Sequence, residues 1–112
     1  MTVDKIAFAG QIEPEHVAQI AEQGFKSVIC NRPDFEGGEG QPQSQEIQAE
    51  VEKLGMTYVY QPIVAGQITE KDVRQFAEYY NQLAKPILVF CRTGNRSNNL
   101  YQLAVQMDLL DD

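Results

Sequence analysis

The chain has 112 residues, of which 43% are hydrophobic and 22% charged, a composition typical of one soluble globular domain. Sixteen acidic against nine basic side chains give a formal net charge of −7, which excludes the overall basic field used to bind nucleic acid or anionic lipid. No apolar run approaches the roughly 18 residues of a membrane span, and residues 1–8 lack the charged-then-apolar order of a signal peptide. We expect a cytoplasmic domain over residues 1–112 that binds neither nucleic acid nor membrane.

The small number of cysteine and histidine residues limits the redox and metal chemistry. Without a secretion signal, Cys30 and Cys91 are expected to be free thiols rather than a disulfide. Together with His16, the only histidine, they show no metal-ligand spacing. We therefore expect no metal and no other cofactor.

The hydrophobic pattern predicts four strands, each followed by a helix. The strands are expected at residues 5–9, 25–31, 57–63 and 86–91. Such alternation predicts parallel crossovers and an α/β fold with helices on both faces of the sheet. The run 86–91 is continuously apolar, as expected of a strand in the middle of the sheet.

Each expected helix carries apolar residues on one face. These are Val17, Ile20 and Ala21 in the first helix, Ile47, Val51 and Leu54 in the second, Val73, Phe76, Ala77, Tyr80, Leu83 and Ala84 in the third, and Leu100, Leu103, Ala104 and Met107 in the fourth. Pro14 suits the first turn of the first helix, and glycines at 24 and 55 end the first two. Thr69 and Asp72 resemble a capping box that begins the third helix, which Pro86 stops. The glycine-rich stretch 33–43 is expected to be a mobile loop.

The segment 91–97 holds the candidate active site, because it lies between the buried strand and the last helix, where open α/β sheets bind ligands. Gly94 allows successive backbone N–H groups to converge, and the helix adds its positive end, which makes an anion cradle. Arg96 can hold two oxygens of an anion in a bidentate fork. Helix N-termini and nearby arginines lower cysteine pKa values to about 3.5–7.5. Cys91 is therefore predicted to be a thiolate nucleophile; the alternative is a small buried hydrophobe beside solvated arginines.

The other cysteine and the histidine are given structural roles. Cys30 ends a strand that is expected to pair beside the Cys91 strand, so it is either a resolving thiol or, as we favour, a buried structural cysteine. His16 is expected at the surface. Without a Cys–His dyad, Cys91 must be activated by its own loop.

The order of the elements and the loop Cys-Arg-Thr-Gly-Asn-Arg-Ser at 91–97 resemble the cysteine-dependent phosphatase superfamily. Segments at 9–11, 24–34, 55–58 and 66–69 further resemble a small bacterial phosphatase-like family whose domains also occur fused to beta-lactamase-hydrolase-like persulfide dioxygenases. The resemblance implies a dual-specificity-phosphatase-like fold, with a thiolate at Cys91 and anion binding by Arg96.

Two departures from the phosphatase pattern bear on the reaction. Phosphatases place five residues between the cysteine and the arginine, whereas four separate Cys91 from Arg96, a spacing that resembles rhodanese-type sulfurtransferases. The phosphatase general acid would follow the third strand, yet residues 55–69 contain no acid. Sulfur transfer needs that acid less, because sulfite or a thiolate leaves without a proton.

We therefore predict a sulfurtransferase in which Cys91 takes sulfur from thiosulfate or a persulfide and passes it to a thiol acceptor, with a persulfide dioxygenase as a candidate partner. Ser97 would hydrogen-bond the sulfur. The expected anion-binding residues are Arg92, Thr93, Gly94, Asn95, Arg96 and Arg32. The alternatives are a phosphatase with a phosphocysteine intermediate and a non-catalytic anion- or redox-sensing module.

The loop after the second strand adds further candidates. Asp34 would replace the missing acid if it faces the same crevice, although a turn former is the favoured interpretation. Arg32 either steers a small anion or pairs with Glu36 at the surface. Glu36 and Glu39 would repel acidic phosphoproteins, which favours a small anionic substrate. The last helix, close to the end of the sequence, leaves a face that a second copy of the chain could cover, so a homo-oligomer is a further expectation.

Overall fold

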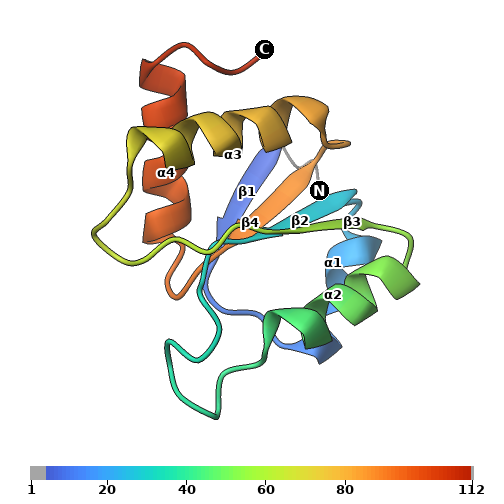
Figure 1. Cartoon of the computed structure of the whole chain (residues 1–112). Helices are drawn as coiled ribbons and strands as arrows, with labels where there is room; N and C mark the ends of the chain where they lie inside the picture. The colour runs from blue at the N-terminus through green and yellow to red at the C-terminus, as the bar shows by residue number, and fades with distance from the viewer. Residues whose placement is uncertain (1–4, 112) are drawn as a thin grey trace.

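A four-stranded parallel sheet forms the centre of the computed structural model, which describes residues 5–111 (Figure 1). The strands are β1 (Ile6–Ala9), β2 (Ser27–Cys30), β3 (Thr57–Tyr60) and β4 (Ile87–Phe90). Their order across the sheet is β1-β4-β2-β3, so β4 pairs with β1 on one side and with β2 on the other. The predicted parallel α/β fold, with the strand after Pro86 in the middle of the sheet, is confirmed.

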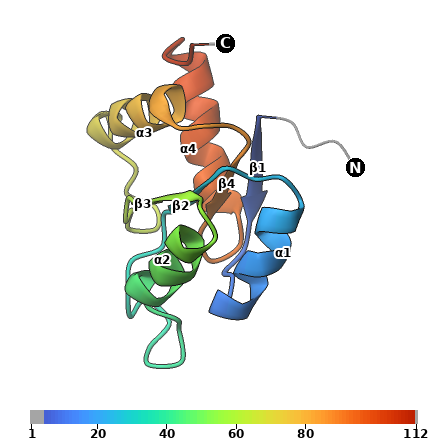
Figure 2. The ribbon, with the colours of Figure 1, turned by 90° about the vertical axis from the view of Figure 1, so that its right-hand side faces the viewer.

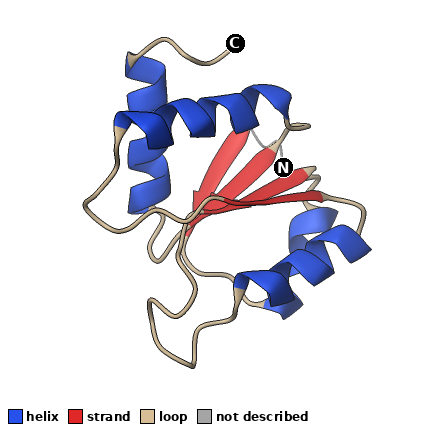
Figure 3. Ribbon diagram, in the orientation of Figure 1, coloured by secondary structure: helices blue, strands red, loops and turns tan. Residues whose placement is uncertain are grey.

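Helices cover both faces of the sheet. A 3-10 turn η1 (Pro14–His16) leads into α1 (Val17–Glu22), which lies with α2 (Ser44–Lys53) on one face. The other face carries α3 (Glu70–Gln82) and α4 (Asn95–Gln106), which pack against each other. Figures 2 and 3 show the two helix pairs on opposite sides of the strands. No helix within residues 5–111 is long and apolar enough to cross a membrane.

The two central strands contribute alternate side chains to two separate cores. Val28, Cys30, Leu88 and Phe90 face α1 and α2, whereas Ile29, Ile87, Val89 and their neighbours face α3 and α4. Both strands are therefore buried on both faces, as a continuously apolar run predicts.

The predicted helix faces hold except at three helix ends, and one of these is α4, which ends at Gln106, before the predicted Met107. Leu54, expected on the buried face of the second helix, is 43% exposed, because α2 ends at Lys53. The third helix was expected to run through Leu83 and Ala84, but it ends at Gln82. Lys85 Nζ donates to the carbonyl of Tyr80 at 2.6 Å, and this is the carbonyl that an Ala84 N–H would bond if the helix continued.

The capping box at the start of α3 forms as its sequence predicts. The Asp72 N–H donates to Thr69 Oγ1 at 3.2 Å, and the Thr69 N–H donates to the Asp72 carboxylate at 3.0 Å. Because all four strands are parallel, their carboxyl ends and the loops that follow them meet at one edge of the sheet.

Candidate active site

The loop after β4 turns directly into α4 and places Cys91 at the carboxyl edge of the sheet. Gly94 caps α4 with φ of 94°, in the left-handed region that glycine adopts without strain. In this conformation its N–H donates to Cys91 Sγ at 3.1 Å. The loop after β4 packs closely against the end of β1. This packing depends on Gly10, where an added Cβ would lie 3.0 Å from the carbonyl oxygen of Arg92.

The amides of this loop make Cys91 more acidic than an ordinary thiol. Cys91 is only 1% exposed, and burial alone would raise its pKa. Hydrogen bonds from the backbone and hydroxyl of Ser97 and from the backbone N–H groups of Thr93 and Gly94 outweigh burial and lower the pKa. The predicted thiolate thus has a physical basis in N–H donors of its own loop, and Arg96 is not among the causes.

The hydroxyl of Ser97 has two possible acceptors, the Cys91 sulfur and the side chain of Asn31. Ser97 Oγ donates at 2.8 Å to Oδ1 of the fully buried Asn31, so its one proton does not also reach the sulfur in this arrangement. The Asn31 Nδ2 group in turn donates to the carbonyl of Gln61 at 3.0 Å. The backbone N–H groups, that of Ser97 included, are therefore the constant stabilisers of the thiolate, and the Ser97 hydroxyl contributes only when it turns away from Asn31.

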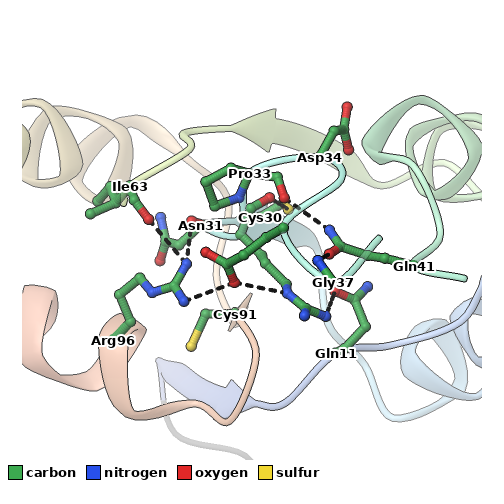
Figure 4. Close-up of polar contacts among 12 residues, drawn as sticks. Gln11, Cys30, Asn31, Pro33, Asp34, Gly37, Gln41, Ile63, Cys91 and Arg96 are labelled. Atoms are coloured by element: carbon green, nitrogen blue, oxygen red, sulfur yellow. Dashed lines mark hydrogen bonds and ion pairs between the residues drawn. The ribbon is translucent and has the colours of Figure 1, made fainter. Parts of the chain in front are cut away.

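The guanidinium of Arg96, in the first turn of α4, is held by the loops after β2 and β3 (Figure 4). Arg96 Nη1 donates to the carbonyl of Ile63 at 3.0 Å and lies 3.5 Å from that of Asn31. Arg96 Nη2 donates to Glu36 Oε1 at 3.0 Å. The side chain is 10% exposed, so the fork is nearly buried and fixed in direction.

Arg32 also pairs with the carboxylate of Glu36. Its Nε donates to Glu36 Oε1 at 3.0 Å, and its Nη1 donates to Gln11 Oε1 at 3.2 Å. Burial raises the pKa of Glu36, but the two arginines outweigh it and lower the pKa. The pairing of Arg32 with Glu36, one of two expectations for that arginine, is present, and Arg96 joins it.

Asp34 is oriented toward α2 rather than toward Cys91 (Figure 4). Its Oδ1 accepts the N–H of Ser44, the first residue of α2, at 2.7 Å, and its own N–H donates to the Tyr60 hydroxyl at 2.9 Å. A carboxylate placed in this way stabilises a helix start, which matches the turn-forming interpretation.

Cys30 is a buried thiol with the opposite chemistry to Cys91. Its Sγ donates to the carbonyl of Arg32 at 3.4 Å, and it is 3% exposed. Burial raises its pKa to about 11. His16, as expected, lies at the surface, where its Nδ1 accepts the N–H of Glu13.

A cavity of about 630 Å³ opens at the Cys91 loop. The predicted residues that line it are Cys91, Arg92, Thr93, Asn95 and Arg96. The rest of the lining comes from Ala65, Gly66 and Ile68 and from uncharged side chains of α4. Asp34, Arg32 and Ser97 are not part of the lining, and no lining residue is an acid or a histidine.

Sequence reasoning did not single out Gln11 and Asn31, nor the contact of Glu36 with Arg96. Gln11 closely follows the predicted strand 5–9, and Asn31 ends the predicted strand 25–31. A polar residue at or just past a strand end is the only local signal they carry. The contact of Glu36 with Arg96 joins residues 60 positions apart, so no local pattern indicates it.

The parallel sheet, whose central strand ends in a cysteine loop with an arginine at the start of the next helix, has the cysteine-dependent phosphatase fold that its solved neighbours share. The chain belongs to the family of phosphatase-like domains of beta-lactamase hydrolase-like proteins, whose family model matches residues 1–107.

Curated relatives and solved structures agree with this family. Beta-lactamase hydrolase-like proteins of Agrobacterium fabrum and of Xylella fastidiosa are 32% and 30% identical over 105 residues, 94% of the chain. The chain spans about a quarter of the length of these relatives. A candidate phosphatase from Neisseria meningitidis superimposes with a TM-score of 0.86 at 33% identity, covering 95% of this chain and 75% of that one. The catalytic core of the yeast phosphatase Siw14 shares the fold, with a TM-score of 0.71 at 18% identity over 99% of this chain and 66% of that one.

Proposed function

We propose that the chain is a cysteine-dependent enzyme in which the Cys91 thiolate attacks a small anionic substrate and holds the transferred group covalently. The observation that carries this proposal is the cavity at Cys91, which presents an acidified thiol and two arginines and whose lining lacks an acid and a histidine. Because no lining side chain can protonate a leaving group, we infer a substrate whose leaving group departs as a stable anion.

Sulfur transfer satisfies this condition. The Cys91 thiolate attacks the outer sulfur of thiosulfate, a new S–S bond forms, and sulfite leaves with the electron pair of the broken bond. A thiolate acceptor then attacks the outer sulfur of the Cys91 persulfide and releases the Cys91 thiolate. The spacing of four residues between Cys91 and Arg96 favours this reaction. A persulfide dioxygenase is the partner we propose for the sulfur product.

Phosphoryl transfer is the second candidate, and family membership favours it. The thiolate would attack phosphorus, the ester oxygen would leave with its electron pair, and water would hydrolyse the phosphocysteine. Asp34 would have to give up the Ser44 N–H to act as the acid, and otherwise water must supply the proton. We therefore expect hydrolysis to favour activated aryl phosphates and to fail with phosphoserine.

One set of incubations separates these reactions from a binding module without turnover. In a sulfurtransferase, thiosulfate adds the mass of one sulfur atom to the intact protein, cyanide removes it, and Cys91→Ser abolishes the addition whereas Cys30→Ala does not. In a phosphatase, aryl phosphate is hydrolysed in a Cys91-dependent manner and thiosulfate leaves no added mass. If neither substrate reacts at Cys91 at neutral pH, the enzymatic proposal is wrong and the sensing module replaces it.

A further inference from the structure

The loop between β2 and α2 brings a carboxylate to two arginines beside Cys91. The same oxygen of Glu36 accepts from Arg96 Nη2 and from Arg32 Nε, each at 3.0 Å. The side chains of Arg96 and Arg32 are 10% and 11% exposed, and that of Glu36 is 25% exposed. Two nearly buried guanidinium groups therefore converge on one oxygen atom.

Glu36 is the carboxylate that pairs with both arginines. Arg32 and Arg96 carry two positive charges, and Glu36 supplies one negative charge. The other acid of this part of the loop, Asp34, is bonded to the Ser44 N–H instead. Since nearly buried charges are stable when paired, a ligand that displaces Glu36 from the two arginines must bring an anionic group of its own.

Glu36 is carried by a loop that is held mainly by polar contacts of its own. Gln41 closes the loop: its Oε1 accepts the Gly37 N–H at 2.7 Å, and its Nε2 donates to the carbonyl of Pro33 at 2.9 Å. The preceding Phe35 is 61% exposed and has φ of 66°, in the left-handed region that favours glycine. Withdrawal of the Glu36 carboxylate therefore breaks two charge-assisted hydrogen bonds and disturbs no packed apolar side chain.

We propose that Arg32 and Arg96 form an anion subsite for a carboxylate of the substrate, next to the group that reacts at Cys91, and that Glu36 is an internal substitute for that carboxylate. The inference rests on the proposed function for the position of the reacting group. The substrate class is then a small organic anion with a carboxylate near its phosphoryl or thiosulfonate group. Such a ligand displaces Glu36 and gains both arginine forks, whereas an anion without a carboxylate leaves Glu36 in place.

Binding to the Cys91→Ser protein tests the subsite without any chemistry. Methyl phosphate and phosphoglycolate carry a phosphoryl group on the same kind of ester oxygen, and only phosphoglycolate has a carboxylate. Calorimetry should show phosphoglycolate binding about tenfold or more tightly than methyl phosphate. Arg32→Gln should remove most of this preference. Arg74→Gln, which removes one positive charge from an exposed pair on α3, should preserve it.

Substitution of Glu36 distinguishes an internal substitute from a residue that only orients Arg96. If Glu36 competes with the ligand, Glu36→Gln raises the affinity for phosphoglycolate several-fold, and Glu39→Gln on the same loop does not. A Glu36→Gln variant that binds both ligands more weakly, or with unchanged affinity, would show that Glu36 orients Arg96 and would overturn the proposal. The proposal would also be overturned if methyl phosphate and phosphoglycolate bound with equal affinity to the Cys91→Ser protein that retains Glu36.

The subsite proposal and the proposed reaction at Cys91 can be refuted independently of each other. A preference for phosphoglycolate that requires Arg32, in a protein that transfers neither sulfur nor a phosphoryl group, supports the subsite and refutes the proposed reaction. Turnover at Cys91 without that preference refutes the subsite alone.

Discussion

Cys30 and Cys91 lie at the ends of neighbouring strands, yet their hydrogen bonds run in opposite directions. Cys91 Sγ accepts the Gly94 N–H, whereas Cys30 Sγ donates to the carbonyl of Arg32. An N–H donor favours the thiolate and a carbonyl acceptor favours the thiol. The loop amides lower the pKa of Cys91, while burial raises that of Cys30 to about 11.

The two thiols should therefore differ in their reaction with an alkylating agent. At pH 7 we expect one modified cysteine per folded chain, located at Cys91, with a rate midpoint below the ordinary thiol pKa of about 8.5. The folded state keeps Cys30 protonated until the pH approaches 11. Mass spectrometry of the alkylated peptides checks this. Modification of both cysteines at pH 7, or a peroxide-induced disulfide between them, would contradict the structural role given to Cys30.

Arg96 should be required for turnover but not for the acidity of Cys91. A lysine at this position has one nitrogen and cannot hold two oxygens of an anion in a fork while it also bonds the carbonyl of Ile63. Loss of one charged fork costs about 1.5–3 kcal/mol, so Arg96→Lys should lose on the order of 10- to 100-fold in kcat/KM. The Cys91 alkylation midpoint should stay unchanged, because loop N–H groups lower that pKa. A large rise in the midpoint would show that Arg96 charge activates the thiol.

At the scale of the elements, local patterns predict most of the architecture. The capping box at Thr69 and the apolar strands depend on neighbours in the sequence, and all of them appear close to their expected bounds. The errors at Leu54 and Ala84 arise at helix ends, and at the end of α3 a single hydrogen bond from Lys85 replaces the next turn. Helix ends depend on such single contacts, which periodicity does not encode.

Most of the predicted site also follows from one local segment, 91–97, but the surroundings of Arg96 do not. Its partners Asn31, Glu36 and Ile63 belong to loops after two other strands. These loops lie together only because of the order of the strands in the sheet, and no single segment of the sequence predicts that order.

The turn between β4 and α4 offers a test that separates backbone strain from site chemistry. Gly94 and Gly24 have φ of 94° and 96°, and a Cβ would clash with nothing at either. Alanine at either position should lower the free energy of unfolding by about 1–2 kcal/mol. Only Gly94→Ala should also raise the Cys91 pKa, because it displaces the N–H that bonds the sulfur. Denaturant titrations and alkylation profiles of both variants measure this, and equal thiol pKa values in the two would argue against the Gly94 contact.

At the scale of the whole molecule, the site exists only when distant segments are folded together. Gln11, Arg32, Glu36 and Arg96 form one chain of hydrogen bonds across 85 positions of the sequence. Unfolding therefore removes the activation of Cys91 and exposes Cys30 at the same time. The two changes of reactivity should follow the same cooperative transition as the loss of helix signal.

A urea titration with pulsed alkylation near pH 6.5 checks this expectation. Cys91 should lose its fast reaction, and Cys30 should become as reactive as Cys91, at the midpoint seen by circular dichroism. Loss of Cys91 reactivity at lower urea than the helix signal would show that the active-site loop opens independently of the sheet.

The parallel sheet also separates the site from the points where the chain can be joined to other domains. The site lies at the carboxyl edge, whereas β1 begins, and α4 ends, at the opposite edge (Figure 1). A flexible linker attached there would have to reach around a molecule with a longest extent of 35 Å. With a root-mean-square span of about 5–6 Å times the square root of its length, a linker whose average span matches that extent has roughly 40 residues. A domain joined by a shorter flexible linker would therefore be held preferentially near the edge opposite Cys91.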